Sequence, residues 1–172
     1  MEFKKKDVKI IILSGHSGSG KTTISNIIKK CHDCIVLSYS SYIKNIALNV
    51  TDWSGSTLTK PRLFLQQFGD VLRNYDKNIF INRMLEDIYA YSYFYDLIVI
   101  DDARFASEIE VIKKNYDVLS IRIMGSKKPL EENLKNHITE TSLDNYNDFD
   151  YVIENDINVE DKLRDILRRI YE

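Results

Sequence analysis

The most restrictive feature of this 172-residue chain is one glycine-rich octapeptide near its N-terminus. Residues 15–22 read Gly-His-Ser-Gly-Ser-Gly-Lys-Thr and match the pattern GxxxxGK[ST] at every fixed position. That pattern indicates a phosphate-binding loop where it connects a strand to a helix. Here the β-branched, apolar residues 8–13 precede the loop, and isoleucines at helical spacing follow it at positions 24, 27 and 28. The sequence therefore predicts a nucleotide-binding P-loop.

Each fixed position of this loop has a chemical purpose. The glycines let successive peptide N–H groups point inward and form an anion nest, and the following helix adds its positive N-terminal dipole. Lys21 is expected to reach the terminal phosphates of ATP, and the Thr22 hydroxyl to hold magnesium. The predicted ATP-binding residues of the loop are Gly15, His16, Ser17, Gly18, Ser19, Gly20, Lys21, Thr22 and Thr23.

Strand and helix patterns alternate from end to end, which predicts an α/β fold with a parallel sheet covered by helices. Strands are expected over 8–13, 35–37, 97–100, 118–123 and 151–153. Helices are expected over 22–30, 41–48, 61–68, 81–88, 105–112 and 159–170, with Gly69 ending or bending the third. The length fits one domain over residues 1–172, in which the polar segment 125–143 is interpreted as a lid.

An acidic group should accompany Thr22 at the magnesium, and an aspartate at the end of a neighbouring strand usually supplies it. The run Leu-Ile-Val-Ile at 97–100 ends in Asp101 and Asp102. The pattern alone does not choose between these two carboxylates.

Composition and missing motifs exclude several classes of protein. The net charge of −2 and the absence of a long basic tract argue against a nucleic-acid polymer as partner. No run approaches the roughly 18 apolar residues of a membrane span, so a cytoplasmic protein is expected. A GTPase would carry a guanine-reading N/TKxD segment, which the sequence lacks. A motor or remodelling ATPase would usually be larger, and small P-loop domains with a polar lid are typically kinases of small molecules.

Such a kinase needs cations that clamp two phosphorylated ligands and neutralise the transferring group. Arg104 stands out because it lies two residues past Asp102, where an open α/β sheet presents its ligand crevice. The full set of candidates is Lys44, Arg62, Arg73, Arg83, Arg104, Arg122, Lys127 and Lys128.

Six segments, in order over nearly the whole chain, resemble the phage-type deoxynucleoside monophosphate kinases, a branch of the nucleoside monophosphate kinase group. The octapeptide is the first. The others are residues 39–44, ending in Lys44; residues 61–73, similar to R-x-L-L-Q-x-x-G-T…R; residues 102–108, similar to D-x-R-F-x-x-E; residues 137–140, similar to H-x-S-E; and residues 150–155, similar to D-x-x-I-x-N.

The resemblance implies a P-loop kinase fold, with a five-stranded parallel sheet and a lid, that transfers phosphate from ATP to a deoxynucleoside monophosphate with Mg²⁺ as cofactor. By this resemblance Asp102, rather than Asp101, is the catalytic and metal-binding aspartate, beside the catalytic residues Lys21 and Arg104. Asn155 would lie near the adenine of ATP. The implied acceptor-binding residues are Lys44, Gln66, Arg73, Arg104 and Glu140.

The sequence differs from the family pattern in two places, and two alternative functions stay open. Asp70 stands where the family often has threonine, and Lys127 and Lys128 replace an arginine pair in the lid, so the group that neutralises the transferring phosphoryl is open. The glycine loop and residues 143–155 also resemble those of animal-type phosphomevalonate kinases, which makes that activity the alternative. A nucleotide-binding regulatory module with little turnover is the rival of another class. Base preference, ribose tolerance and oligomeric state, including a homodimer, are left open.

Overall fold

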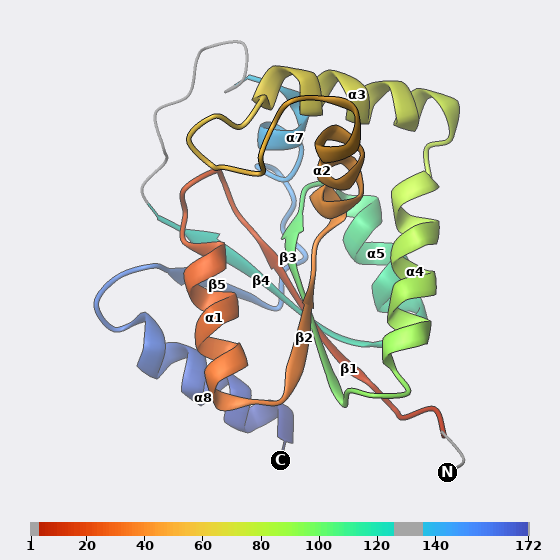
Figure 1. Ribbon diagram of the computed structural model, residues 1–172. Coiled ribbons are helices and arrows are strands. Elements are labelled where there is room, and N and C mark those ends of the chain that lie inside the picture. The colour runs from red at the N-terminus through yellow and green to blue at the C-terminus, as the bar shows by residue number, and fades with distance from the viewer. Residues whose placement is uncertain (1–3, 126–135, 172) are drawn as a thin grey trace.

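The computed structural model describes residues 4–125 and 136–171 (Figure 1). Five strands form one parallel sheet in the order β2-β3-β1-β4-β5. The strands are β1 (Lys9–Ser14), β2 (Cys34–Leu37), β3 (Leu97–Ala103), β4 (Asp117–Met124) and β5 (Tyr151–Glu154). The helices are α1 (Lys21–Cys31), α2 (Tyr39–Val50), α3 (Arg62–Tyr75), α4 (Ile79–Tyr91), α5 (Ala106–Asn115), α7 (Ile138–Thr141) and α8 (Val159–Tyr171).

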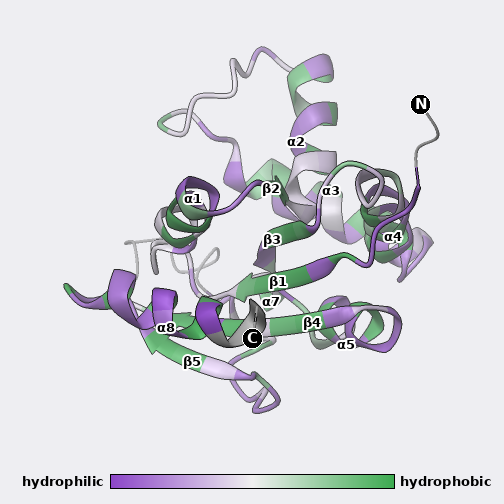
Figure 2. Cartoon of the chain, turned by 90° about the horizontal axis from the view of Figure 1, so that it is seen from below, coloured by the Kyte–Doolittle hydropathy of each residue, from purple (hydrophilic) through white to green (hydrophobic). Residues whose placement is uncertain are grey.

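Helices cover both faces of the sheet, as Figure 2 shows from below. Alternate residues of β1 point to opposite faces because successive side chains of a strand alternate. Ile10 and Ile12 pack with apolar side chains of α2, α4 and α5, whereas Ile11 and Leu13 pack with those of α1 and α8. The central strands are therefore apolar on both faces, as expected for a parallel sheet between helical layers.

The architecture confirms the predicted fold class, and the five strands and six expected helices lie where the patterns place them, while α7 lies in the segment interpreted as a lid. Gly69 neither ends nor visibly breaks α3, which continues to Tyr75. A Cβ at Gly69 would lie 3.0 Å from Ile43 Cδ1, so this glycine lets α3 approach α2 closely. Much of the expected lid, including Lys127 and Lys128, lies outside the described residues.

The carboxyl ends of the parallel strands meet at one edge of the sheet, where α2, α3 and α7 also gather (Figure 1). The octapeptide follows β1 there, and Asp101 and Asp102 close β3 beside it. The topology thus brings the predicted ATP and acceptor residues to one place. No helix in the described ranges is long and apolar enough to cross a bilayer.

Candidate phosphotransfer site

The octapeptide forms a loop that wraps the N-terminus of α1. Gly20 has φ 100°, in the left-handed region, and α1 begins at the next residue. A Cβ on Gly20 would lie 2.0 Å from Asn155 Nδ2, and that amide donates a hydrogen bond of 3.0 Å to the Ser19 carbonyl. Conformation and space both require glycine here, so Asn155 supports the loop from outside.

Lys21 lies in the loop with its ammonium group turned toward the loop's own backbone. Nζ donates to the carbonyl oxygens of Gly15 at 2.7 Å and His16 at 2.9 Å. Burial, followed by the nearby Arg104 charge, lowers the pKa of Lys21 to about 8. An incoming phosphate would offer this lysine a stronger, charged acceptor than these carbonyl groups.

The two aspartates at the end of β3 have different surroundings. Asp102 accepts hydrogen bonds from Ser38 Oγ at 2.6 Å, the Tyr39 N–H at 2.7 Å and the Ser40 N–H at 3.0 Å. Burial alone would raise the pKa of Asp102, but the bonds from Ser38 and Ser40 outweigh it and hold the pKa below its usual range. Asp102 therefore caps the N-terminus of α2.

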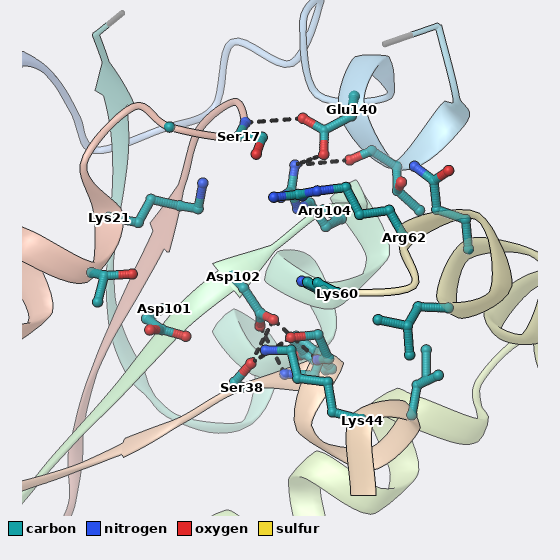
Figure 3. Close-up of a pocket in the computed structure, with 18 of the residues that line it drawn as sticks. Ser17, Lys21, Ser38, Lys44, Lys60, Arg62, Asp101, Asp102, Arg104 and Glu140 are labelled. Carbon is teal, nitrogen blue, oxygen red and sulfur yellow. Dashed lines mark hydrogen bonds and ion pairs between the residues drawn. The ribbon is translucent and has the colours of Figure 1, made fainter. Parts of the chain in front are cut away.

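Asp101 points toward the P-loop side of the site (Figure 3). Within residues 4–125 and 136–171, its carboxylate accepts no hydrogen bond from another residue and forms no ion pair. Burial and the adjacent Asp102 raise the pKa of Asp101 to about 6. Sequence resemblance favours Asp102 for the metal, whereas the geometry leaves Asp101 as the carboxylate that is free to take one.

Magnesium fits this set of donors only together with a nucleotide. No group of three or more His, Cys, Asp or Glu side chains in the described part of the chain could hold a metal alone. Mg²⁺ in such sites typically uses one or two carboxylates with phosphate oxygens and water. Asp101 and Thr22 both line the pocket and supply that minimal set of oxygens.

Opposite the P-loop, a group of cations lines the same pocket of about 690 Å³ (Figure 3). Among the described residues, Lys44, Lys60 and Arg62 have neither an ion pair nor a side-chain hydrogen bond. Burial, and then the charges of Lys44, Arg62 and Arg104, lower the pKa of Lys60 to about 8. This part of the pocket carries three positive charges that form no ion pair with the carboxylates of the described residues.

Arg73 and Arg104 complete the cationic wall and are held by Glu108. The buried Glu108 carboxylate accepts the N–H of Arg104 at 2.7 Å and of Phe105 at 3.1 Å, and lies 3.9 Å from Arg73 Nη2. Its burial raises the pKa of Glu108 to about 7. The Arg73 guanidinium also lies over the ring of Phe105 at 4.6 Å. The D-x-R-F-x-x-E segment thus positions two arginines at the pocket.

A second ionic cluster lies beneath the loop rather than in the pocket. The buried Arg122 donates to Ser14 Oγ at 3.0 Å and to Asp144 Oδ1 at 2.8 Å. The same Asp144 oxygen lies 2.9 Å from His16 Nε2. Asp144 therefore neutralises a buried arginine and connects it to the P-loop.

Replacing Asp144 with alanine should destabilise the fold, because Arg122 would stay buried without its counter-ion. Asp144 is 39% exposed, so solvent weakens the effect, and we expect a loss of about 2 kcal/mol in the free energy of unfolding. Urea denaturation measures it. The control Asp148→Ala removes a carboxylate that is 81% exposed. A loss for Asp144→Ala no larger than that of the control would show that water compensates Arg122.

The pocket brings together most of the residues predicted from the sequence. Its lining includes Ser17, Gly18, Gly20, Lys21, Thr22, Thr23, Lys44, Arg62, Gln66, Arg73, Asp101, Asp102, Arg104 and Glu140. Four predicted ATP contacts do not line it, namely Gly15, His16, Ser19 and Asn155. Arg83 lies on the exposed face of α4 with Glu86 and Asp87, and Arg122 belongs to the cluster beneath the loop.

Sequence reasoning missed Lys60, whose pKa is lowered by burial and then by the charges of Lys44, Arg62 and Arg104. It lies in the irregular stretch between α2 and α3, where no periodic pattern orients side chains. Lys60 directly precedes Pro61 and Arg62, at the start of α3, and α3 contributes residues to the pocket. That position was the one indication in the sequence that Lys60 belongs to the site.

Neither a protein-family model nor a curated protein matches this sequence. The fold, however, matches solved structures. The APS kinase of Mycobacterium tuberculosis in complex with AMPPNP and APS aligns over 97% of this chain and 99% of its own, at 11% identity and a TM-score of 0.55. The dephospho-CoA kinase of Campylobacter jejuni aligns over 97% and 98%, at 13% identity and a TM-score of 0.56.

The shikimate kinase of Acinetobacter baumannii in complex with shikimate aligns over 96% of this chain and 94% of its own, at 15% identity and a TM-score of 0.54. The chain has the fold of P-loop kinases. Identities this low establish the fold alone, and the matched enzymes are named for chemically different acceptors. The choice of acceptor must therefore be argued from the pocket of this chain.

Proposed function

We propose that this chain is a kinase that transfers the terminal phosphate of ATP to the phosphate of a deoxynucleoside 5′-monophosphate, within a single cytoplasmic domain. One observation carries the proposal. The pocket that the P-loop lines continues into a wall of cations, three of which, Lys44, Lys60 and Arg62, have no anionic partner among the described residues. A site of this charge favours an acceptor that is itself an anion.

The amide of Gln66 supports a nucleobase at the far end of the acceptor. Gln66 lines the pocket beside the apolar side chains of Ile43 and Leu65. Its Oε1 atom is buried and has no hydrogen-bond partner among the described residues. A buried acceptor atom without a donor is unfavourable, and a base with an amino or ring N–H group would satisfy it.

The proposed reaction is an in-line transfer that needs positioning and charge neutralisation rather than a general base, because the acceptor oxygen is already anionic. Lys21 would bind the terminal phosphates of ATP, while Arg104, Arg73 and Lys44 would hold the acceptor phosphate. Magnesium bound with ATP would neutralise phosphate charge, with Thr22 and Asp101 as its protein ligands. Asp102 would act by fixing the N-terminus of α2, and so the position of Lys44.

The phosphomevalonate alternative rests on the glycine loop, which does not distinguish the two activities, and on residues 143–155, whose position weakens it. Asp144 neutralises Arg122, Asp150 accepts from the N–H and Oγ of Ser120, and Asn155 supports Ser19. These residues stabilise β4, β5 and the P-loop and do not line the pocket. That likeness therefore concerns the scaffold and carries no information about the acceptor.

ADP release tests the proposal, with Mg-ATP and a panel of the four deoxynucleoside monophosphates, their ribose counterparts and phosphomevalonate. Turnover of one or more deoxynucleotides at a kcat/KM well above that of phosphomevalonate supports the proposal and identifies the base. Turnover of phosphomevalonate alone would establish the alternative. Tight ATP binding without transfer to any acceptor would instead indicate a regulatory module.

Acceptor affinity should depend on pH through Lys60, whose pKa of about 8 lies below its usual value. A bound phosphate favours the ammonium form, so affinity is full below pH 8 and declines above it, by up to about tenfold per pH unit, because binding must then take up a proton. Calorimetry on either side of pH 8 measures the decline. Lys60→Arg keeps its charge over this pH range and should flatten the profile. An equally steep profile in Lys60→Arg would remove Lys60 from the acceptor site.

A further inference from the structure

One carboxylate joins the two halves of the pocket. Glu140, in the short helix α7, accepts the N–H of Ser17 on Oε2 at 3.0 Å, and its Oε1 lies 2.9 Å from Arg104 Nη1 (Figure 3). Its side chain is only 10% exposed. The carboxylate therefore bridges a peptide donor of the P-loop and a cation of the acceptor wall.

Both partners of Glu140 are groups that phosphate oxygens would use. The Ser17 N–H belongs to the loop whose peptide groups form the anion nest, and Arg104 is the arginine closest in sequence to the end of β3. A carboxylate oxygen accepts from such donors as a phosphate oxygen does. The Glu140 side chain connects the Ser17 N–H directly to Arg104. The Ser17 N–H therefore lies at the end of the P-loop that faces the acceptor. The terminal phosphate of a bound ATP must lie at that end.

An anion cannot stay at this position during transfer without opposing it. The terminal phosphate of ATP and the acceptor phosphate are both negative, and they approach each other between the P-loop and Arg104. A third negative charge there would repel both of them at short range, in a pocket where water screens weakly. The Glu140 carboxylate must therefore leave when both ligands bind.

The backbone of α7 is held independently of that carboxylate. His137 caps α7 by accepting the Thr139 N–H, and its Nε2 lies 2.9 Å from Asp70 of α3. Ser142, which directly follows α7, donates through Oγ to the backbone carbonyl of Arg104. The side chain of Glu140 can thus be displaced, or replaced by mutation, while the helix stays in place.

We propose that Glu140 is an internal competitor of the terminal phosphate of ATP, an inference that rests on ATP binding at the P-loop. The Glu140 carboxylate accepts the Ser17 N–H and pairs with Arg104. The terminal phosphate of ATP takes the Ser17 N–H, displaces the carboxylate and so frees Arg104 for the acceptor phosphate. ADP lacks that phosphate and leaves Glu140 in position, so Glu140 lowers the affinity for ATP and leaves the affinity for ADP unchanged.

Calorimetric titration of AMPPNP and of ADP, each with magnesium, tests this role without turnover. Glu140→Gln removes the charge and keeps the shape, and we expect it to bind AMPPNP about tenfold more tightly than the wild type. Its affinity for ADP should change by less than about twofold, since ADP does not compete with the carboxylate. Glu86→Gln, an identical change on the exposed face of α4, serves as control and should change neither affinity.

Two results would overturn the proposal. Unchanged or weaker AMPPNP binding in Glu140→Gln would show that the carboxylate supports the bound state instead of competing with it. Equal tightening for AMPPNP and ADP would reveal a general effect of charge rather than competition with the terminal phosphate. The kinase proposal is tested separately, because these affinities need no acceptor. If Glu140→Gln binds AMPPNP selectively more tightly but the protein phosphorylates no deoxynucleotide, the role of Glu140 stands and only the proposed acceptor is rejected.

Discussion

Replacing Lys21 with alanine is expected to lower kcat for phosphoryl transfer by about a thousandfold, equivalent to about 4 kcal/mol in the activation barrier. Lys21 is the cation of the P-loop, and within the described residues the hydrogen bonds of its ammonium group go to carbonyl oxygens alone. It is therefore available to a phosphate, and its contribution should grow as negative charge shifts toward ADP during transfer. Steady-state kinetics with saturating acceptor and Mg-ATP measure the loss.

Lys29→Ala is the matched control, because Lys29 is exposed on the same helix, α1, and does not line the pocket. Its kcat should stay within about twofold of the wild type, as for surface substitutions away from a site. Thermal denaturation of both variants separates lost chemistry from lost fold. A Lys21→Ala protein that is folded and retains near-normal kcat would remove the P-loop from the reaction.

Arg104→Ala should lower kcat/KM for the acceptor by about a hundredfold to a thousandfold, with a much smaller effect on the KM for ATP. The guanidinium lies in the pocket and is shared between Glu140 at 2.9 Å and the Thr139 carbonyl at 3.2 Å. Its removal takes a positive charge from the place where the acceptor phosphate is proposed to bind. Initial rates at fixed ATP and varied acceptor measure the effect.

Two further variants refine this result. Arg104→Lys keeps the charge but loses the planar fork of donors, so its kcat/KM should lie between those of the wild type and Arg104→Ala. Arg83→Ala removes an arginine that is exposed and paired with Glu86 and Asp87 on α4, and it should leave acceptor kinetics unchanged. If Arg104→Ala affected ATP and acceptor equally, Arg104 would serve mainly to hold Glu140.

The fold could be predicted from the sequence because its signals are local. The spacing of apolar residues determines each strand and helix, and the octapeptide requires a strand before it and a helix after it. Gly69 shows where local rules stop. A glycine commonly ends a helix, yet here it lies inside α3, because its lack of a side chain lets Ile43 of α2 approach. That requirement comes from another helix and is not visible in residues 61–73 themselves.

The candidate site was predictable in part for the same reason. Lys21 begins α1, Arg104 directly follows β3, and Lys44 lies within the amphipathic helix α2; all three line the pocket. The different surroundings of Asp101 and Asp102 were not predictable, because they depend on hydrogen bonds from Ser38, Tyr39 and Ser40, far away in the sequence. The bridge that Glu140 makes to Ser17 likewise depends on how α7 folds back onto the loop.

The strand order has a consequence for the protein while it is being synthesised. β1 leaves the ribosome first, yet both of its neighbours in the sheet, β3 and β4, come from much later in the chain. Until Met124 has emerged, the isoleucines of β1 lack at least one partner strand and present an unpaired apolar edge. The nascent chain therefore passes through a long aggregation-prone interval, and a product truncated after α5 would be a substrate for chaperones and proteases rather than a smaller nucleotide-binding module.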